Sequence, residues 1–233
     1  MANLAVIPAR GGSKRIPRKN IKHFCGQPII NYSIQAALVS DLFDEVMVST
    51  DDTEIAEIAL EAGASVPFLR KADTANDMAA IIDVLEEVID AYSQRGKVYD
   101  LVCCLLPTAP LLSVVDIRQS YELLQQCDYD SVFPVVRFGY PILRSLRIED
   151  GKAYMMWPEN YFKRSQDLPP AFHDAGQFYW FRPQCCFSAK RIFTENTGVI
   201  ELPESRVQDI DTEQDWELAE LKYRLITRAQ EAE

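Results

Sequence analysis

The chain has 233 residues, 48% hydrophobic and 25% charged, which is ordinary for one globular α/β domain with room for a small extra lobe. Its formal net charge of −11 argues against nucleic acid or an anionic membrane as the main partner. No run of about 18 apolar residues predicts a membrane span, and the N-terminus is too short in apolar residues and insufficiently basic for a signal peptide, so we expect a cytoplasmic protein.

Strand-like and helix-like segments alternate through the first 136 residues. Apolar runs predict strands over residues 4–7, 45–49, 101–106 and 131–136. Amphipathic patterns predict helices over residues 28–38, 53–61, 78–94 and 114–126, with Asp51 or Asp52 as a cap of the second. This alternation favours an α/β fold: an open, mostly parallel sheet with helices on both faces.

The pattern changes between residues 138 and 170, where short alternating segments at 145–149 and 152–157 predict a small β-rich lobe. The chain then returns with predicted strands at 177–181 and 198–201 and a helix at 212–229. We therefore expect one α/β domain over residues 1–137 and 171–233. The six cysteines lack the spacing of metal ligands, which favours buried thiols.

A basic loop follows the first predicted strand. Six lysines and arginines and no acid lie between Arg10 and Lys22, and the loop contains the pair Gly11 and Gly12. Glycines let backbone amides approach phosphate oxygens, and arginine and lysine neutralise them. The spacing is neither GxxxxGK[ST] nor GxGxxG. The loop predicts a site for a small anion such as a triphosphate; the alternative is a solvated basic loop.

The segment Asp209-Ile210-Asp211 is a candidate metal site. If it is extended, both carboxylates point to one face while Ile210 enters the core. Mg²⁺ takes one or two protein carboxylates beside substrate phosphates. The alternative for Asp211 is a helix N-cap with Gln214 completing a capping box, and spacing alone favours that alternative.

Several ordered motifs resemble one family. Residues 7–21, IPARGGSKRIPRKNI, resemble the N-terminal signature of the CMP-sugar-acid synthetases, or acylneuraminate cytidylyltransferases, and further matches follow at residues 48–51, 68–70, 106–110, 166–169 and 209–213. The resemblance implies a nucleotide-diphospho-sugar transferase-like fold. It also implies an enzyme that, with Mg²⁺, transfers CMP from CTP to a nine-carbon 2-keto sugar acid (a nonulosonic acid) and releases pyrophosphate.

The resemblance also implies roles for individual residues. The catalytic candidates are Arg10, Lys19 and Asp211, and the metal ligands are Asp209 and Asp211. The nucleotide-binding candidates are Ala9, Arg10, Gly11, Gly12, Ser13, Asn20, Arg70 and Asp77. For Arg70 the alternative is an exposed arginine of a helix or loop.

The acceptor motifs depart from the sialic-acid branch. Ala175 in HDAGQFYW stands where that branch has asparagine, and Leu106 stands where it has glutamine, so two polar groups near the sugar acid are missing. The pattern resembles most the branch that acts on pseudaminic acid. N-acetylneuraminate, legionaminate and ketodeoxyoctonate remain alternative acceptors. The acceptor-binding candidates are Leu106, Thr108, Arg144, Arg164, Ala175, Gly176 and Gln177. For Arg144 and Arg164 the alternative is exposed charges of the lobe.

The lobe over residues 138–170 resembles the family's dimerisation lobe. Its aromatic residues Tyr154, Trp157, Tyr161 and Phe162 suit an interface core, so we expect a homodimer; the alternative is packing within one chain. Two other functions remain open. One is a nucleotide-binding regulatory protein without catalysis, and the other is a nucleic-acid-binding module, which the net acidity disfavours.

Overall fold

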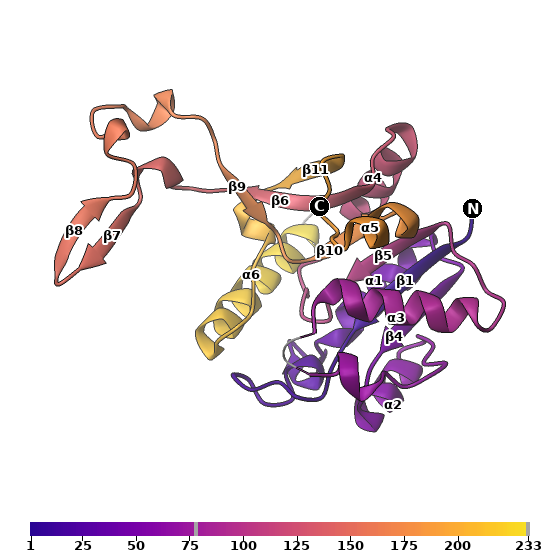
Figure 1. The fold of residues 1–233 in the computed structure, drawn as a ribbon. Coiled ribbons are helices and arrows are strands. Elements are labelled where there is room, and N and C mark those ends of the chain that lie inside the picture. Colours follow the sequence, from indigo (N-terminus) through magenta and orange to yellow (C-terminus); the bar gives the residue numbers. More distant parts are fainter. Residues whose placement is uncertain (77–78, 232–233) are drawn as a thin grey trace.

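A central sheet of seven strands organises the molecule (Figure 1). The computed structural model describes residues 1–76 and 79–231. Six strands lie in the order β11-β6-β10-β5-β1-β4, and β9 pairs with β6. The strands are β1 (Asn3–Pro8), β4 (Glu45–Ser49), β5 (Leu101–Leu105), β6 (Ser131–Arg137), β9 (Phe172–Asp174), β10 (Phe178–Phe181) and β11 (Thr197–Leu202).

The sheet is mostly parallel, as the sequence predicts. β1 runs parallel to β4 and β5, and β11 runs parallel to β6. β10 is antiparallel to both β5 and β6, an orientation that the sequence analysis did not predict. The short strand β9, also antiparallel to β6, was not predicted either.

Helices cover both faces of the sheet. Successive residues of β1 point to opposite faces, so Ala5 and Ile7 join one buried cluster while Leu4 and Val6 join another. The first cluster lies under α1 (Ile30–Ser40), α2 (Thr53–Glu61) and α4 (Val114–Gln126), and the second under α3 (Ile81–Ser93) and α5 (Pro183–Ala189). The predicted α/β fold with helices on both faces is confirmed.

A third apolar cluster joins the two ends of the chain. The last helix, α6 (Glu213–Glu231), packs Trp216 against Phe24 of the hairpin formed by β2 (His23–Phe24) and β3 (Gln27–Pro28). Ile16 of the basic loop and Ile210 of the predicted metal segment are buried in the same cluster. The fold therefore brings the basic loop and the segment of Asp209 and Asp211 together.

Residues 138–170 form an arm that projects away from the sheet (Figure 1). The arm holds one hairpin, β7 (Leu146–Glu149) and β8 (Lys152–Met155), and three single 3₁₀ turns over Ile142–Arg144, Pro158–Asn160 and Ser165–Asp167, so it has less strand than predicted. Several of its apolar side chains are exposed, as Phe162 is 94% and Ile148 is 77% accessible, whereas Leu168 is buried and Trp157 is half-buried.

Other boundaries differ from the predictions by a few residues. The first helix begins at Ile30 instead of residue 28, because Pro28 pairs with His23 in the β2–β3 hairpin. The third begins at Ile81; residue 78, where it was predicted to begin, lies outside the described residues. All six cysteines are free thiols, of which Cys103, Cys104 and Cys186 are buried. Among the described residues, no helix has the length and apolarity needed to cross a membrane.

Candidate active site

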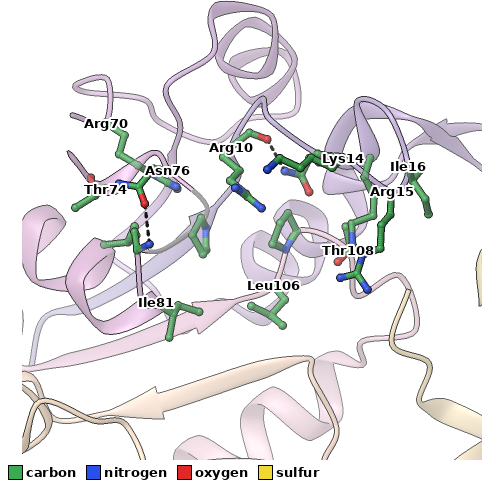
Figure 2. Close-up of a pocket in the computed structure, with 17 residues that line it drawn as sticks. Arg10, Lys14, Arg15, Ile16, Arg70, Thr74, Asn76, Ile81, Leu106 and Thr108 are labelled. Carbon is green, nitrogen blue, oxygen red and sulfur yellow. Dashed lines mark hydrogen bonds between the residues drawn. The ribbon is translucent and has the colours of Figure 1, made fainter. Parts of the chain in front are cut away.

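A cavity of about 570 Å³ opens where β1 and β5 end (Figure 2). Open parallel sheets bind ligands at the carboxyl ends of their strands. Three segments line the cavity: the loop after β1, described residues of the stretch from Arg70 to Val84, and residues 106–108 after β5. In Figure 2, Arg10 lies between Arg70 on one side and Arg15 on the other.

The cavity is strongly cationic in an otherwise acidic protein. Its described lining contains five lysines and arginines and no aspartate or glutamate. The basic residues are Arg10, Lys14, Arg15, Lys19 and Arg70. With a formal net charge of −11 for the whole chain, this concentration of positive charge selects for an anionic ligand. The alternative of a solvated basic loop is therefore not supported.

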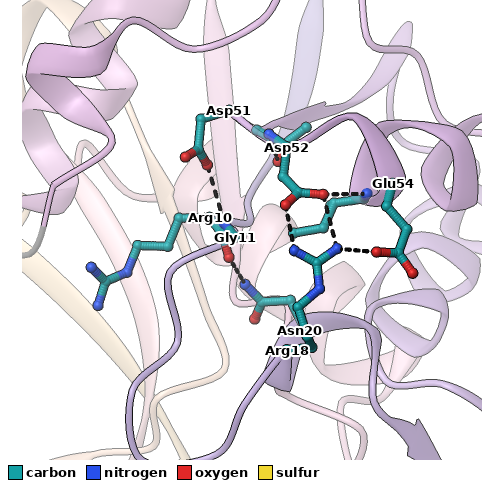
Figure 3. A network of polar contacts seen from close by, with 9 residues as sticks. Arg10, Gly11, Arg18, Asn20, Asp51, Asp52 and Glu54 are labelled. Atoms are coloured by element: carbon teal, nitrogen blue, oxygen red, sulfur yellow. Dashed lines mark hydrogen bonds and ion pairs between the residues drawn. The ribbon is translucent and has the colours of Figure 1, made fainter.

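Backbone and side-chain bonds fix the basic loop at the end of β4. The Ala9 amide donates to the Ser49 carbonyl at 2.9 Å, and Asn20 Nδ2 donates to the Arg10 carbonyl at 2.9 Å. The Gly11 amide donates to Asp51 Oδ1 at 3.1 Å (Figure 3). These bonds hold Arg10 with its side chain turned toward the cavity.

Only part of the predicted nucleotide-binding set lines the cavity. Arg10, Ser13, Asn20 and Arg70 do so, as do the acceptor candidates Leu106 and Thr108 and the catalytic candidate Lys19. Ala9, Gly11 and Gly12 do not: Ala9 is buried in the core, the Gly11 amide is bound to Asp51, and Gly12 is exposed. Asp77 lies outside the described residues.

Arg70 is a buried residue of the cavity wall and not an exposed arginine. It is 8% accessible, its amide donates to the Thr50 carbonyl at 2.8 Å, and its Nε donates to Ser49 Oγ at 3.0 Å. Burial lowers the pKa of its guanidinium, while the nearby Asp51 carboxylate acts in the opposite direction. The end of β4 thus holds Arg70 as well as the basic loop.

Asp211 faces the basic loop. Its Oδ1 lies 2.9 Å from Arg15 and 3.6 Å from Lys19, and Lys19 Nζ also donates to the Ile210 carbonyl at 2.6 Å. Ile210 is buried, as predicted, and Asp209 is exposed. The carboxylate of Asp211 is therefore placed beside two of the cations that line the cavity.

Asp211 does not cap α6. The Thr212 hydroxyl accepts from the Asp215 amide at 3.2 Å, and the Asp215 carboxylate accepts from the Thr212 amide at 2.8 Å. These reciprocal bonds are a capping box, with Thr212 as the cap. The alternative interpretation of Asp211 as the N-cap paired with Gln214 is wrong, because the box lies one residue further along.

The predicted acceptor residues 175–177 form a turn beside the cavity. The Leu106 amide donates to the Gln177 carbonyl at 2.8 Å, and Gly176 adopts φ +61°. However, the Ala175 side chain is buried in the core, and Gln177 is buried with its Nε2 donating to the Arg206 carbonyl at 2.7 Å. Neither side chain lines the cavity. Of the two positions that depart from the sialic-acid branch, Ala175 and Leu106, only Leu106 lines it.

Two further acceptor candidates lie in the arm and not at the cavity. Arg144 is exposed in the turn Ile142–Arg144, and Arg164 forms two bonds to the Asp167 carboxylate, of 2.7 and 3.0 Å. Because the arm projects away from the sheet, neither arginine reaches the cavity of its own chain.

The sequence analysis missed one wall of the cavity. Its residues are Thr74, Asn76, Ala79, Ile81 and Val84, which lie at and before the start of α3. These residues carry no catalytic chemistry and follow no motif, so only their packing identifies them.

The fold and the cationic cavity define a nucleotide-binding α/β protein of the nucleotidyltransferase type. A profile of the cytidylyltransferase family matches residues 4–221. The chain belongs to this family and is a nucleotidyltransferase, as its motifs predicted.

Curated relatives and solved structures agree. A pseudaminic acid cytidylyltransferase of Campylobacter jejuni is 45% identical over 226 residues, which cover 97% of each chain. A CMP-N,N'-diacetyllegionaminic acid synthase of Legionella pneumophila is 34% identical and covers 100% of this chain and 99% of its own. A CMP:2-keto-3-deoxy-manno-octonic acid synthetase solved with CTP has a TM-score of 0.70 at 18% identity, covers 99% of this chain and all of its own, and supports the fold alone.

Proposed function

We propose that this enzyme transfers CMP from CTP to pseudaminic acid and releases pyrophosphate. The observation that carries the proposal is the cavity with five cations and no described carboxylate, at the carboxyl ends of β1 and β5. A triphosphate needs this concentration of positive charge. The Campylobacter relative named for the same reaction supports the choice of both substrates.

The reaction requires positioning and charge neutralisation more than a reactive side chain. The anomeric hydroxyl of the sugar acid attacks the α-phosphorus of CTP, and pyrophosphate leaves. Arg10 and Lys19 line the cavity from the loop after β1 and would neutralise the charge that develops on the phosphates. No covalent enzyme intermediate is needed.

Asp209 and Asp211 would hold a Mg²⁺ ion. Both offer carboxylate oxygens, the ligands that Mg²⁺ prefers, and neither is taken up by the helix cap. The described residues contain no cluster of three or more potential ligands, which suits an ion that completes its shell with water and phosphate oxygens. When bound, the ion would offset the negative charge of the triphosphate.

The choice of acceptor rests on Leu106 and on the relatives. Leu106 presents an aliphatic side chain to the cavity where the sialic-acid branch has glutamine, and a deoxygenated, N-acylated sugar has fewer hydroxyls to satisfy. Legionaminate, N-acetylneuraminate and ketodeoxyoctonate are alternative acceptors for the same machinery. A regulatory protein without catalysis is less well supported, because Arg10 and Lys19 are both placed at the cavity.

We also propose a homodimer built through the arm. The arm exposes Ile148, Tyr161 and Phe162, and burial of such apolar surface between two copies would be favourable. A second copy could then receive Arg144 and Arg164 near its own cavity. Light scattering after size exclusion tests this: a dimer is expected, Phe162→Asp should weaken it, and a monomeric wild-type protein would contradict it.

A cytoplasmic location completes the proposal, because six free thiols suit a reducing compartment.

The direct test of nucleotide use is pyrophosphate release with Mg²⁺, pseudaminate and each of CTP, UTP, ATP and GTP. We expect turnover with CTP alone. Equal turnover with UTP would contradict a cytidylyltransferase.

A further inference from the structure

Arg18 belongs to the basic loop but does not line the cavity. Its neighbours Arg15 and Lys19 line the cavity, whereas Arg18 does not. Its guanidinium contacts both Asp52 oxygens, with Nη2 at 3.0 Å from Oδ1, and also Glu54 (Figure 3). In Figure 3, the Arg10 side chain points away from this group of contacts. The positive charge of Arg18 is thus paired with carboxylates of the same chain.

The backbone of Arg18 is also unusual. It adopts φ 54° and ψ 32°, in the left-handed region that non-glycine residues rarely occupy. Its carbonyl accepts from the Ile21 and Lys22 amides, both at 3.0 Å, and so begins the 3₁₀ turn Lys19–Ile21. This turn sets the direction of Lys19, whose ammonium reaches the Ile210 carbonyl.

Asp52 binds one end of the loop and lies close to the other. Besides pairing with Arg18, it lies so close to Gly11 that a Cβ on that residue would be 2.5 Å from Asp52 Oδ2. Asp52 Oδ1 also accepts from the Ile55 amide at 3.1 Å and caps α2, which anchors it to a helix of the main domain. The loop residues between Gly11 and Arg18 include four that line the cavity: Ser13, Lys14, Arg15 and Ile16.

We propose that Arg18 is a positioning residue that, by pairing with Asp52 and Glu54, holds the basic loop in the shape that presents Arg10 and Lys19 to the triphosphate. This inference rests on the proposed use of CTP. In this proposal, residues between β4 and the first turn of α2 determine the shape of the basic loop.

The geometry distinguishes this pair from an ordinary surface ion pair. Isolated exposed pairs contribute little, but a two-pronged arginine–carboxylate contact fixes direction as well as charge. The side chains of Arg18 and Asp52 are 38% and 21% accessible, so both are partly screened from solvent. The Arg18 hydrogen bond holds the pKa of Asp52 below its ordinary value, and Asp52 is charged when the enzyme works near neutral pH.

Four variants separate positioning from stability. Arg18→Ala removes the guanidinium, and Arg18→Gly removes it while relieving the left-handed backbone. Asp52→Asn retains an oxygen that can cap α2 but loses the charge that Arg18 binds. Arg118→Ala is the matched control, because Arg118 also ties two segments, donating from α4 to the Ser40 carbonyl at 3.1 Å, and does not line the cavity.

The readouts are the CTP dissociation constant measured without acceptor, the steady-state constants, and the melting temperature. We expect Arg18→Ala and Asp52→Asn each to weaken CTP binding or lower kcat/KM for CTP by about 10- to 100-fold, since small misplacements of binding groups have effects of this size. The variant that combines Arg18→Ala with Asp52→Asn should lose no more CTP binding or kcat/KM than the more affected single variant. Arg118→Ala should alter only the melting temperature.

Three outcomes would overturn the inference: CTP binding and kcat/KM both within twofold of wild type in Arg18→Ala, full additivity in the variant that combines Arg18→Ala with Asp52→Asn, or CTP binding and kcat/KM both equal to wild type in Arg18→Gly. The last would mean that backbone conformation alone shapes the loop. Failure of the wild-type enzyme to bind CTP would instead contradict the proposed function. The two failures are therefore distinguishable.

Discussion

The Lys19 ammonium donates to the Ile210 carbonyl at 2.6 Å, across 191 residues of sequence. This bond joins the basic loop to the segment that carries Asp209 and Asp211. Ile210 is buried beside Ile16 of the same loop, so apolar packing supports the polar contact. The proposed phosphate-binding side and the proposed metal side are thus held together by contacts within the chain.

Asp211→Asn should raise the magnesium requirement sharply. The change removes the carboxylate charge that attracts the ion but leaves the capping box of Thr212 and Asp215 intact, so the fold should be retained. Turnover measured against Mg²⁺ concentration checks this. Glu213→Gln, at an exposed carboxylate paired with Lys22, is the control and should not move the titration. An unchanged titration in Asp211→Asn would remove this residue from the metal site.

Arg10→Ala should reduce kcat by about 10²- to 10³-fold, the range seen when a preorganised charge-stabilising group is removed. Its side chain lies in the cavity and its backbone, not its guanidinium, receives the Asn20 bond that shapes the loop. Circular dichroism should therefore show an intact fold. Turnover equal to that of the wild type would contradict a role on the phosphates.

Leu106→Gln should change acceptor preference more than CTP affinity. Leu106 lines the cavity directly after β5, and its amide is bound to the turn of residues 175–177, which we assign to the acceptor side. An added amide could satisfy a hydroxyl that a leucine cannot. Specificity constants for pseudaminate and N-acetylneuraminate, measured with CTP saturating, check this. A change confined to the KM for CTP would place Leu106 on the nucleotide side.

Glu45, which does not line the cavity, should make the free energy of unfolding depend on pH. Burial raises the pKa of its carboxyl, but bonds from Lys97, Tyr92, Ser65 and Tyr99 outweigh burial and lower the pKa to about 2. Because the folded-state pKa is depressed, the stabilisation is complete above the unfolded value of 4.5 and is lost as the pH falls toward 2.

The variant Glu45→Gln should therefore lower the free energy of unfolding by about 1–3 kcal/mol at pH 7. The difference from wild type should shrink as the pH falls from 4.5 toward 2, because the unfolded wild-type chain takes up a proton that Glu45 resists in the folded state. Urea unfolding across this pH range is the measurement. Glu217→Gln, at an exposed position of α6, should show no such pH-dependent difference. A constant difference at every pH would exclude the linkage.

Much of the sheet was predictable because the signal is local. The continuous apolar run of β1, buried on both faces of the sheet, and the amphipathic helices between strands indicate the α/β fold directly. The direction of β10 was not predictable, because all four of its residues, Phe178–Phe181, are buried and nothing in such a run encodes strand orientation. The change of pattern at residue 138 predicted a separate lobe, but the exposure of Phe162 could not be predicted, since composition does not show which aromatic side chains of a lobe pack within the chain.

The site divides in the same way. The basic loop and the segment of Asp209 and Asp211 were found from their own charge pattern and spacing. The resemblance to family motifs supplied Arg70 and favoured the metal interpretation of Asp211 over the cap. The contacts of Asp51 and Asp52 with Gly11 and Arg18 were missed, because they span 34 to 40 residues and only the fold brings these side chains together. Ala175 and Arg164 were predicted to bind the acceptor, but neither lines the cavity, since position in the sequence does not show where a side chain points.

The most direct test is pyrophosphate release from CTP and Mg²⁺ with pseudaminate, legionaminate, N-acetylneuraminate or ketodeoxyoctonate as the acceptor, with the nucleotide product identified by mass. The account predicts that pseudaminate is converted to its CMP derivative far faster than the other three acids. Preference for another acid would contradict the acceptor assignment, and no turnover with any of them, despite CTP binding, would contradict the catalytic role itself.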